Sequence, residues 1–402
     1  MQNPDLIRIA PPVAAEFYIH AFLRCHRFPQ LIVPIMPRKI KKLTRRKFLK
    51  DTSVNSLMLS SAPVVAAWQM EVDQEELTGL PRLPLVVLSM SSLSPDIAER
   101  IQAISSQISL HSGFGGAEME TFLPKINVLM GGLNEDQLRM AVNLKWVQSP
   151  SAGVEHYLNE RFVRSSVLLT NAKGCYAPAI AEHVFGLLFG LTRGIAGQAV
   201  NMKSGLWAGP GPMLELRGLT MGIVGFGGIG RETARRAQAM DMRVLAADVR
   251  PLYRENLGGL VEECYLVQDE GWYRMLQKCD VVVCAAPHTA ASEGMFDDRA
   301  FRAMKDGAFF INVSRGKLVK TPSLLAAIES GKLAGAGLDV TDPEPLPSGH
   351  PMWGLGNVIV TSHIAGRGQH SWRRVEEVFA ENVRRFVYGL PLLNQVDKQA
   401  GF

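Results

Sequence analysis

The sequence predicts an α/β fold with two lobes, each built on a parallel β-sheet covered by helices. Three observations support this class. From about residue 83 onward, short apolar runs typical of buried strands alternate with stretches of helical periodicity. A glycine-rich turn at residues 225–230 lies directly between one such strand and one such helix. A long apolar helix pattern at residues 177–202 separates two series of alternating elements and is expected to link the lobes.

The first lobe is expected to start near residue 83. Its predicted strands are residues 84–89, 107–111, 128–130 and 146–148, and its predicted helices are residues 94–104 and 133–142. Asn134 is the expected N-cap of the second helix, because its side-chain oxygen can accept from the free N–H groups at a helix start.

The second lobe is expected from residue 219 to about residue 360. Its predicted strands are residues 221–224, 243–247, 281–283, 308–313, 335–340 and 358–361, and residues 231–240 are its first helix. Glycines within residues 205–211 are expected to end the linking helix. Residues 371–388 form a last predicted helix.

The glycine-rich turn has the spacing of a dinucleotide-binding motif. Gly225 would allow the tight turn, Gly227 would let the backbone approach a pyrophosphate, and Gly230 would let the helix pack close to the strand. Gly228 and Ile229 complete the motif at the helix N-terminus, where free N–H groups and a partial positive charge favour phosphates. Strand, turn and helix together predict a Rossmann-type nucleotide-binding lobe.

Asp248 ends the next predicted strand, about 20 residues beyond the glycines, where an acid reads the ribose 2′-hydroxyl of NAD. A carboxylate at this position repels a 2′-phosphate, so NAD is favoured as the cofactor. Arg250 is able to pair with such a phosphate, which keeps NADP open as the alternative.

Three polar side chains near the C-terminal end form the candidate catalytic set. Arg315 follows a buried strand and offers a planar fork of donors for a carboxylate. His363 also follows a strand and can give or take a proton near neutral pH. Glu344 can orient that imidazole and stabilise its charged form. With a nicotinamide as hydride source, this trio can reduce an α-keto acid.

These motifs resemble the D-isomer-specific 2-hydroxyacid dehydrogenase family. The resemblance runs from about residue 83 to residue 402 and is densest from residue 216 to residue 366. The matching segments are residues 219–230, 310–316, 334–340 and 363–366. The resemblance implies a nucleotide-binding domain inserted in a flavodoxin-like substrate domain. It implies domains at residues 83–200 and 366–402 for substrate and at residues 201–365 for NAD.

The resemblance also implies residue roles. Arg315 matches the arginine that binds the substrate carboxylate and polarises the keto group, Glu344 the paired acid, and His363 the acid–base histidine. The backbone of Ala152 and Gly153 is implied to hold the carboxylate as well. The residues implied on the cofactor side, besides the glycine motif and Asp248, are Pro287, Thr289, Val313, Ser314, Arg315, Asp339 and His363.

The sequence departs from the family pattern at three places. His288 stands where a leucine is usual, and Ser362 replaces a proline that often precedes the catalytic histidine. Glu155 and His156 replace a commoner pair centred on aspartate. None of these changes removes a catalytic group, although His288 lies where it would alter the surroundings of the cofactor.

The net charge of +5 comes from the N-terminal segment. Residues 1–50 hold 11 Lys or Arg against Asp5 and Glu16, a charge of +9, so the other 352 residues total −4. A basic excess confined to one segment does not indicate nucleic-acid binding. No apolar run has the length of a membrane-spanning helix.

Residues 1–82 are interpreted as a leader that is expected to be disordered. Residues 44–50, Thr-Arg-Arg-Lys-Phe-Leu-Lys, resemble a twin-arginine export motif, and a modestly apolar stretch follows at residues 53–65. The favoured hypothesis is a periplasmic protein, with a cytoplasmic one as the alternative. Met36 is an alternative start, in which case residues 1–35 would not be translated.

The leading hypothesis is an NAD-dependent enzyme, expected to be a homodimer, that interconverts a small 2-keto acid and its D-2-hydroxy acid. An NAD-sensing scaffold and a formate- or phosphite-type dehydrogenase are the alternatives. The five cysteines have no metal-site spacing and are expected to be reduced, so no metal is expected; they are Cys25, Cys175, Cys264, Cys279 and Cys284.

Overall fold

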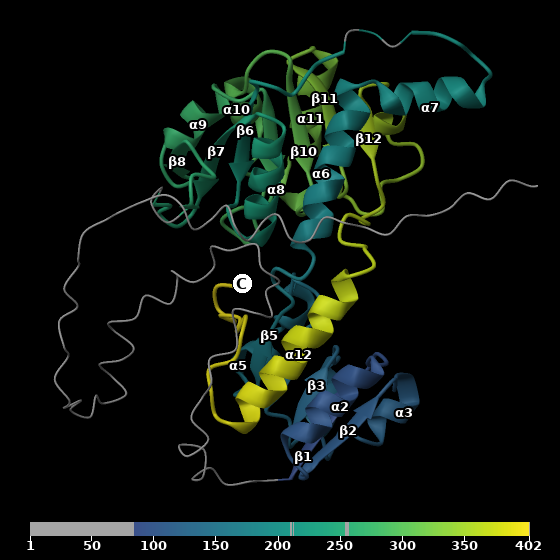
Figure 1. Ribbon diagram of the computed structural model, residues 1–402, viewed down its shortest axis with the longest axis vertical. Helices are drawn as coiled ribbons and strands as arrows, with labels where there is room; N and C mark the ends of the chain where they lie inside the picture. The colour runs from purple at the N-terminus through teal and green to yellow at the C-terminus, as the bar shows by residue number, and fades with distance from the viewer. Residues whose placement is uncertain (1–83, 210, 212, 254–256, 402) are drawn as a thin grey trace, which may run out of the picture. The chain divides into compact units, whose positions relative to one another are not determined.

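The computed structural model describes residues 84–401, except residues 210, 212 and 254–256 (Figure 1). The predicted leader, with its twin-arginine motif and Cys25, lies outside the described residues. The described chain contains two parallel β-sheets, each with its own helices and its own cores of buried apolar side chains. The predicted two-lobed α/β class is therefore confirmed.

The first sheet has five parallel strands in the order β2-β1-β3-β4-β5, which is the flavodoxin-like order. Its strands are β1 (Leu85–Ser89), β2 (Ile108–Ser112), β3 (Val128–Met130), β4 (Trp146–Gln148) and β5 (Leu168–Thr170). The helices between them are α2 (Pro95–Ile104), α3 (Gly116–Glu120), α4 (Glu135–Met140) and α5 (Glu160–Arg164). Asn134 caps α4 as predicted, since its side chain accepts from the Gln137 N–H at 2.8 Å.

The last helix, α12 (Ser371–Val387), returns to this first sheet. It packs against α2, and the two lie side by side in Figure 1. Buried Phe379 and Val383 of α12 share one core with Ile97 and Ile101 of α2. Burying these apolar side chains holds the C-terminal segment on a sheet formed about 200 residues or more earlier in the chain.

The second sheet has seven parallel strands in the order β12-β11-β10-β9-β6-β7-β8. Its strands are β6 (Thr220–Val224), β7 (Arg243–Asp248), β8 (Glu263–Leu266), β9 (Val281–Cys284), β10 (Ala308–Asn312), β11 (Leu333–Leu338) and β12 (Val358–Val360). Its helices are α8 (Gly228–Ala239), α9 (Gly271–Leu276), α10 (Asp298–Ala303) and α11 (Thr321–Glu329). The six strands from β6 to β11 follow the Rossmann order, and the order reverses between β6 and β9. Ligands of such sheets bind at the carboxyl ends of the strands at this switch point.

The prediction of one continuous helix at residues 177–202 is wrong, because the segment forms two helices. It consists of α6 (Ala177–Thr192) and α7 (Ile195–Lys203), with a bend of 68° between them. Gly194 lies at the break with a φ of 62°, a left-handed conformation that ends α6. Buried Phe185 and Leu188 of α6 pack into a core with Ile223 of β6, so α6 covers the second sheet.

The other differences concern short elements. Strands β5 and β8 and helices α3, α5, α9, α10 and α11 were not predicted, and α8 begins at Gly228 rather than at residue 231. Among the described residues no single helix has the length and apolar character needed to cross a membrane; only α6 and α7 taken together, bent as they are, meet that measure by length and composition.

Candidate active site

The glycine turn after β6 has the close approaches that its motif predicts. Gly225 has a φ of 92°, and a Cβ on it would lie 2.5 Å from the backbone nitrogen of Ala286, which follows β9. A Cβ on Gly230 would lie 2.4 Å from the Gly225 carbonyl oxygen. Gly227 precedes α8 as its N-cap and has open space in front of it. The turn thus presents bare backbone and the start of a 12-residue helix at the switch point, which suits a pyrophosphate.

Asp248 ends β7 beside this turn and is only 8% exposed. Its Oδ2 accepts from the Phe226 N–H at 2.8 Å, and its Oδ1 accepts from the Arg250 N–H at 3.1 Å. The Arg250 side chain is exposed, with Nε 3.9 Å from Asp248 Oδ1. Partial burial lowers the pKa of Arg231, and its cationic neighbours Arg235 and Arg250 lower it further. Positive charge therefore surrounds the carboxylate that was predicted to read the ribose.

The loop after β9 is tied to the loop after β10. The Ser314 hydroxyl donates to the Ala286 carbonyl oxygen, and Ser314 and Val313 are both buried. Thr289 closes its own turn, since its N–H donates to Ser292 Oγ at 2.8 Å, and that hydroxyl donates to the Pro287 carbonyl at 2.8 Å. These hydrogen bonds hold the backbone of both loops, which carry the predicted cofactor residues, at the carboxyl edge of the sheet.

His288, the departure at the cofactor loop, has a partner that the sequence did not reveal. Its Nε2 lies 3.0 Å from Glu293 Oε2 within the same turn. The imidazole is 18% exposed, whereas the carboxylate is more than half exposed. The polar contact of His288 is thus made within its own loop, with Glu293.

Arg315 lies three residues beyond β10 and contacts the first lobe. Its Nε donates to Glu155 Oε1 at 3.1 Å, and its Nη1 donates to the Ser314 carbonyl at 2.8 Å. Glu155 begins the short 3₁₀ helix η3 (Glu155–Tyr157), which follows the Ala152–Gly153 loop after β4. A Cβ on Gly153 would lie 1.8 Å from Arg315 Nη2, so the guanidinium rests against bare backbone there. Arg315, Gly153 and Glu155 thus form one cluster.

His363 and Glu344 form the predicted pair. His363 Nδ1 lies 2.7 Å from Glu344 Oε1, and both side chains are about half exposed. With the carboxylate on Nδ1, the Nε2 atom of the imidazole is left for another partner. His363 itself has a φ of 53°, a left-handed conformation that non-glycine residues rarely adopt.

Asp339 holds the backbone around His363. This aspartate follows β11 and is 2% exposed. Its Oδ1 accepts from the Thr361 hydroxyl at 2.6 Å and from the Ile364 N–H at 2.9 Å, and its Oδ2 accepts from the Ala365 N–H at 2.9 Å. Its carbonyl oxygen accepts from the His363 N–H at 2.8 Å. The expected role of Asp339 beside the nicotinamide stays a prediction; the structure shows that its carboxylate already serves this loop.

His183, which is not among the residues predicted for the site, joins the same network. Its Nε2 lies 2.9 Å from Thr361 Oγ1 and 3.5 Å from Asp339 Oδ1. Because the single hydroxyl proton of Thr361 goes to Asp339, the hydroxyl oxygen accepts from His183 Nε2–H. The histidine lies on α6, so the helix that covers the second sheet also contacts the loop of His363. Nothing in the sequence pairs residue 183 with residue 361.

The predicted catalytic residues leave neighbouring strands at one edge of the sheet. Arg315 follows β10, Glu344 and Asp339 follow β11, and His363 follows β12, with β11 between the other two. Adjacent strands lie about 4.8 Å apart, so the ends of β10 and β12 are separated by roughly 10 Å. A carboxylate binder, a proton donor and a dinucleotide turn on one edge can support hydride transfer to a keto acid.

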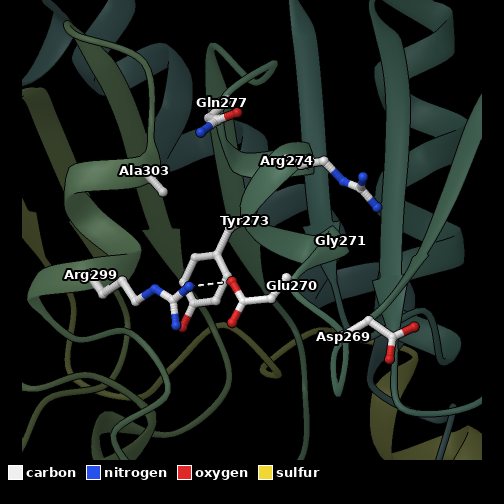
Figure 2. A pocket seen from close by; sticks show the side chains of 8 residues that line it. All are labelled: Asp269, Glu270, Gly271, Tyr273, Arg274, Gln277, Arg299 and Ala303. Carbon is white, nitrogen blue, oxygen red and sulfur yellow. Dashed lines mark hydrogen bonds and ion pairs between the residues drawn. The ribbon is translucent and has the colours of Figure 1, made fainter.

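The cavity drawn in Figure 2 is a separate feature. It has a volume of about 470 Å³ and lies at α9 and α10 of the second lobe. Tyr273 lies with its ring 4.2 Å from the Arg299 guanidinium, and Arg299 also pairs with Glu270. None of the predicted site residues lines this cavity.

Comparison with known proteins places these features in a family. The sequence profile of the D-isomer specific 2-hydroxyacid dehydrogenase, NAD binding domain, matches residues 185–365. A glyoxylate reductase of Thermofilum pendens is 30% identical over 64% of this chain and 76% of its own. A D-3-phosphoglycerate dehydrogenase of Archaeoglobus fulgidus is 29% identical over 77% of this chain; the match spans 59% of that longer protein.

A solved structure agrees in fold. The D-isomer specific 2-hydroxyacid dehydrogenase from Xanthobacter autotrophicus Py2, in complex with NADPH and MES, is 26% identical and covers 79% of this chain and 99% of its own, with a TM-score of 0.67. Three findings agree on the family: the two parallel sheets, the profile match at residues 185–365, and the 30% identity to a relative that is matched over 76% of its length. This chain therefore belongs to the family of D-isomer specific 2-hydroxyacid dehydrogenases, which are oxidoreductases with an NAD-binding domain.

Proposed function

We propose that this protein interconverts a small 2-keto acid and its D-2-hydroxy acid with NAD(H) as the hydride carrier. The observation that carries the proposal is the His363–Glu344 pair, at 2.7 Å, on the sheet edge that also carries Arg315 and the glycine turn. The relative from Thermofilum pendens is named a glyoxylate reductase, which supports a small keto acid as substrate.

Each residue has a role that its chemistry supports. A nicotinamide held at the glycine turn would supply a hydride for the keto carbon, so the residues around the keto oxygen would have to neutralise the negative charge that builds there. His363 donates a proton to that oxygen from Nε2, while Glu344 holds Nδ1 and stabilises the charged imidazole. Arg315 holds the substrate carboxylate with its planar fork of donors. Together they align the keto carbon for a short hydride path.

NAD is the favoured cofactor within this proposal. The bare glycine turn fits a pyrophosphate, and Asp248 stands where the ribose hydroxyls would lie. Arg250 and Arg231 beside it supply positive charge that NADP would use, and the relative from Xanthobacter autotrophicus Py2 holds NADPH. The ratio of kcat/KM for NADH to that for NADPH decides between them: a ratio above one supports NAD.

The enzymatic role is tested by following NADH oxidation with glyoxylate, pyruvate and hydroxypyruvate. We expect turnover with at least one, a large loss of rate for His363→Ala, and a loss of both rate and apparent affinity for Arg315→Ala. Arg164→Ala, in an exposed pair with Glu160, serves as the control and should match the wild type. NADH binding without turnover on a broad panel of acids would instead support the NAD-sensing scaffold. Turnover with formate or phosphite alone would support the third hypothesis.

A homodimer through the second lobe is part of the proposal. α7 has no buried residue, and Trp207 just after it is fully exposed. The large apolar side chains exposed on this segment are Ile195, Val200, Met202, Leu206, Trp207, Met213 and Leu214. Apolar side chains exposed close together along one segment favour an interface, and a second copy is the partner we propose. Sedimentation of the purified protein at the mass of one chain would contradict it.

Export by the twin-arginine route is proposed from the motif at residues 44–50 alone. That route carries folded proteins, so the enzyme would leave the cytoplasm with its cofactor bound. Cell fractionation with N-terminal sequencing tests this. A purely cytoplasmic protein with an intact N-terminus would end the idea.

A further inference from the structure

Arg315, which is predicted to bind the substrate carboxylate, is already paired with a carboxylate of the protein itself. Glu155 Oε1 accepts from Arg315 Nε at 3.1 Å, and both side chains are partly exposed, at 41% and 34%. Glu155 Oε2 lies near the same bare backbone as Arg315 Nη2, because a Cβ on Gly153 would be 2.6 Å from the first and 1.8 Å from the second. The pair therefore fills the space beside the loop implied to hold the substrate carboxylate.

The charges of this pair balance. An incoming keto acid meets a guanidinium whose positive charge is already compensated by Glu155, and two of its N–H donors are in use, one to Glu155 and one to the Ser314 carbonyl. The keto acid must either displace Glu155 or share Arg315 with it, and either route makes the free energy of substrate binding less favourable. A second negative group on the substrate would add repulsion from the same glutamate, because like charges brought together at a binding site disfavour the wrong ligand.

We propose that Glu155 is a specificity-determining residue, which competes with the substrate for Arg315 and disfavours acids that carry a second negative group. The inference rests on the proposed function and names its substrate class: 2-keto acids with a small uncharged substituent. Dicarboxylic and phosphorylated keto acids would be poor substrates. The glutamate acts on the carboxylate end of the ligand, whereas His363 and Glu344 act on the keto oxygen.

An alternative role for Glu155 is to hold Arg315 in position for the substrate. Glu155→Gln separates the two, because the amide oxygen of glutamine still accepts a hydrogen bond from Arg315 Nε while the competing charge is removed. Competition predicts that KM for glyoxylate falls by up to about fivefold, the upper end of the range expected for a partly exposed ion pair. The fall for oxaloacetate, which has two carboxylates, should be larger, and kcat should change little. An unchanged or higher KM for glyoxylate overturns the proposal.

The control is Glu160→Gln, which makes the same change of net charge. Glu160 pairs with Arg164 at 2.7 Å, with both side chains at least 75% exposed, and it should leave both KM values as in the wild type. Binding of oxamate to the NADH-loaded full chain, measured by calorimetry, separates the inference from the proposed function. Tighter oxamate binding by Glu155→Gln without turnover of any acid would uphold the inference and reject the enzyme. Turnover without tighter oxamate binding would reject the inference alone.

Discussion

Replacing Asp339 by asparagine tests whether the loop of His363 is held by a buried charge. The carboxylate accepts three hydrogen bonds, from the Thr361 hydroxyl and from the N–H groups of Ile364 and Ala365. Asparagine has one oxygen and one NH₂ group. Its best orientation places the oxygen where Oδ1 accepts two of these bonds, so the NH₂ group faces the Ala365 N–H and that bond is lost.

The magnitude follows from that lost bond and from the strain it opposes. A hydrogen bond to a charged group contributes about 1.5–3 kcal/mol. A non-glycine residue in the left-handed region, such as His363 with its φ of 53°, carries strain that persists only where its surroundings hold it. If the relaxed loop must re-form before each turnover, about 1.5–3 kcal/mol corresponds to a fall in kcat of roughly 10- to 150-fold.

The assay is steady-state NADH oxidation by Asp339→Asn at saturating keto acid, with the concentration of active enzyme taken from NADH titration so that unfolded protein is not counted. The matched control is Asp306→Asn, whose carboxylate is 91% exposed and pairs with Lys332. We expect the control to keep the wild-type kcat. A kcat within twofold of the wild type for Asp339→Asn would refute the reasoning, because the loop would then hold His363 without the charge.

Two further outcomes are expected. Gly153→Ala should lower kcat/KM for the keto acid by about tenfold or more, because the new Cβ would lie only 1.8 Å from Arg315 Nη2 and would push the guanidinium aside. The control is Gly349→Ala, which has open space for a Cβ and should keep the wild-type kcat/KM. Equal activity of the two variants would contradict the contact between Gly153 and Arg315. Burial raises the pKa of three thiols to about 12, so the native protein at pH 8 should not react with Ellman's reagent at Cys175, Cys279 or Cys284. Since the folded state holds these protons more tightly than a thiol with the ordinary pKa of 9.0, the free energy of unfolding should fall as pH rises past about 9 and not below it, measured by urea denaturation.

Sequence was sufficient for the parts of the fold that depend on local pattern. The strand, glycine turn and helix around Gly225 were predicted because each depends on neighbouring residues only, and the same is true of the Asn134 cap. The break at Gly194 was missed because an apolar helix pattern continues on both sides of it. Helical periodicity alone does not show where a glycine adopts a left-handed conformation.

One contact of the candidate site was predicted from sequence, whereas its contacts between distant segments were not. Glu344 and His363 are 19 positions apart and were paired from their motifs, and the structure shows their contact. Glu155 was noted only as a departure, since its contact with Arg315 spans 160 positions. His183 and Thr361 are 178 positions apart. Contacts of this range depend on how the lobes and α6 pack, which one sequence without relatives does not reveal.

The contact between Arg374 and Cys175 has a mechanical consequence. Within the part of the chain that the structure describes, the polypeptide passes from the first sheet to the second between β5 and α6, and returns between β12 and α12. Arg374, in the first turn of α12, donates from Nε to the Cys175 carbonyl at 2.5 Å, which ties the start of the returning helix to the outgoing crossing. A change in the angle between the two sheets would therefore bend the outgoing crossing and the start of α12 together.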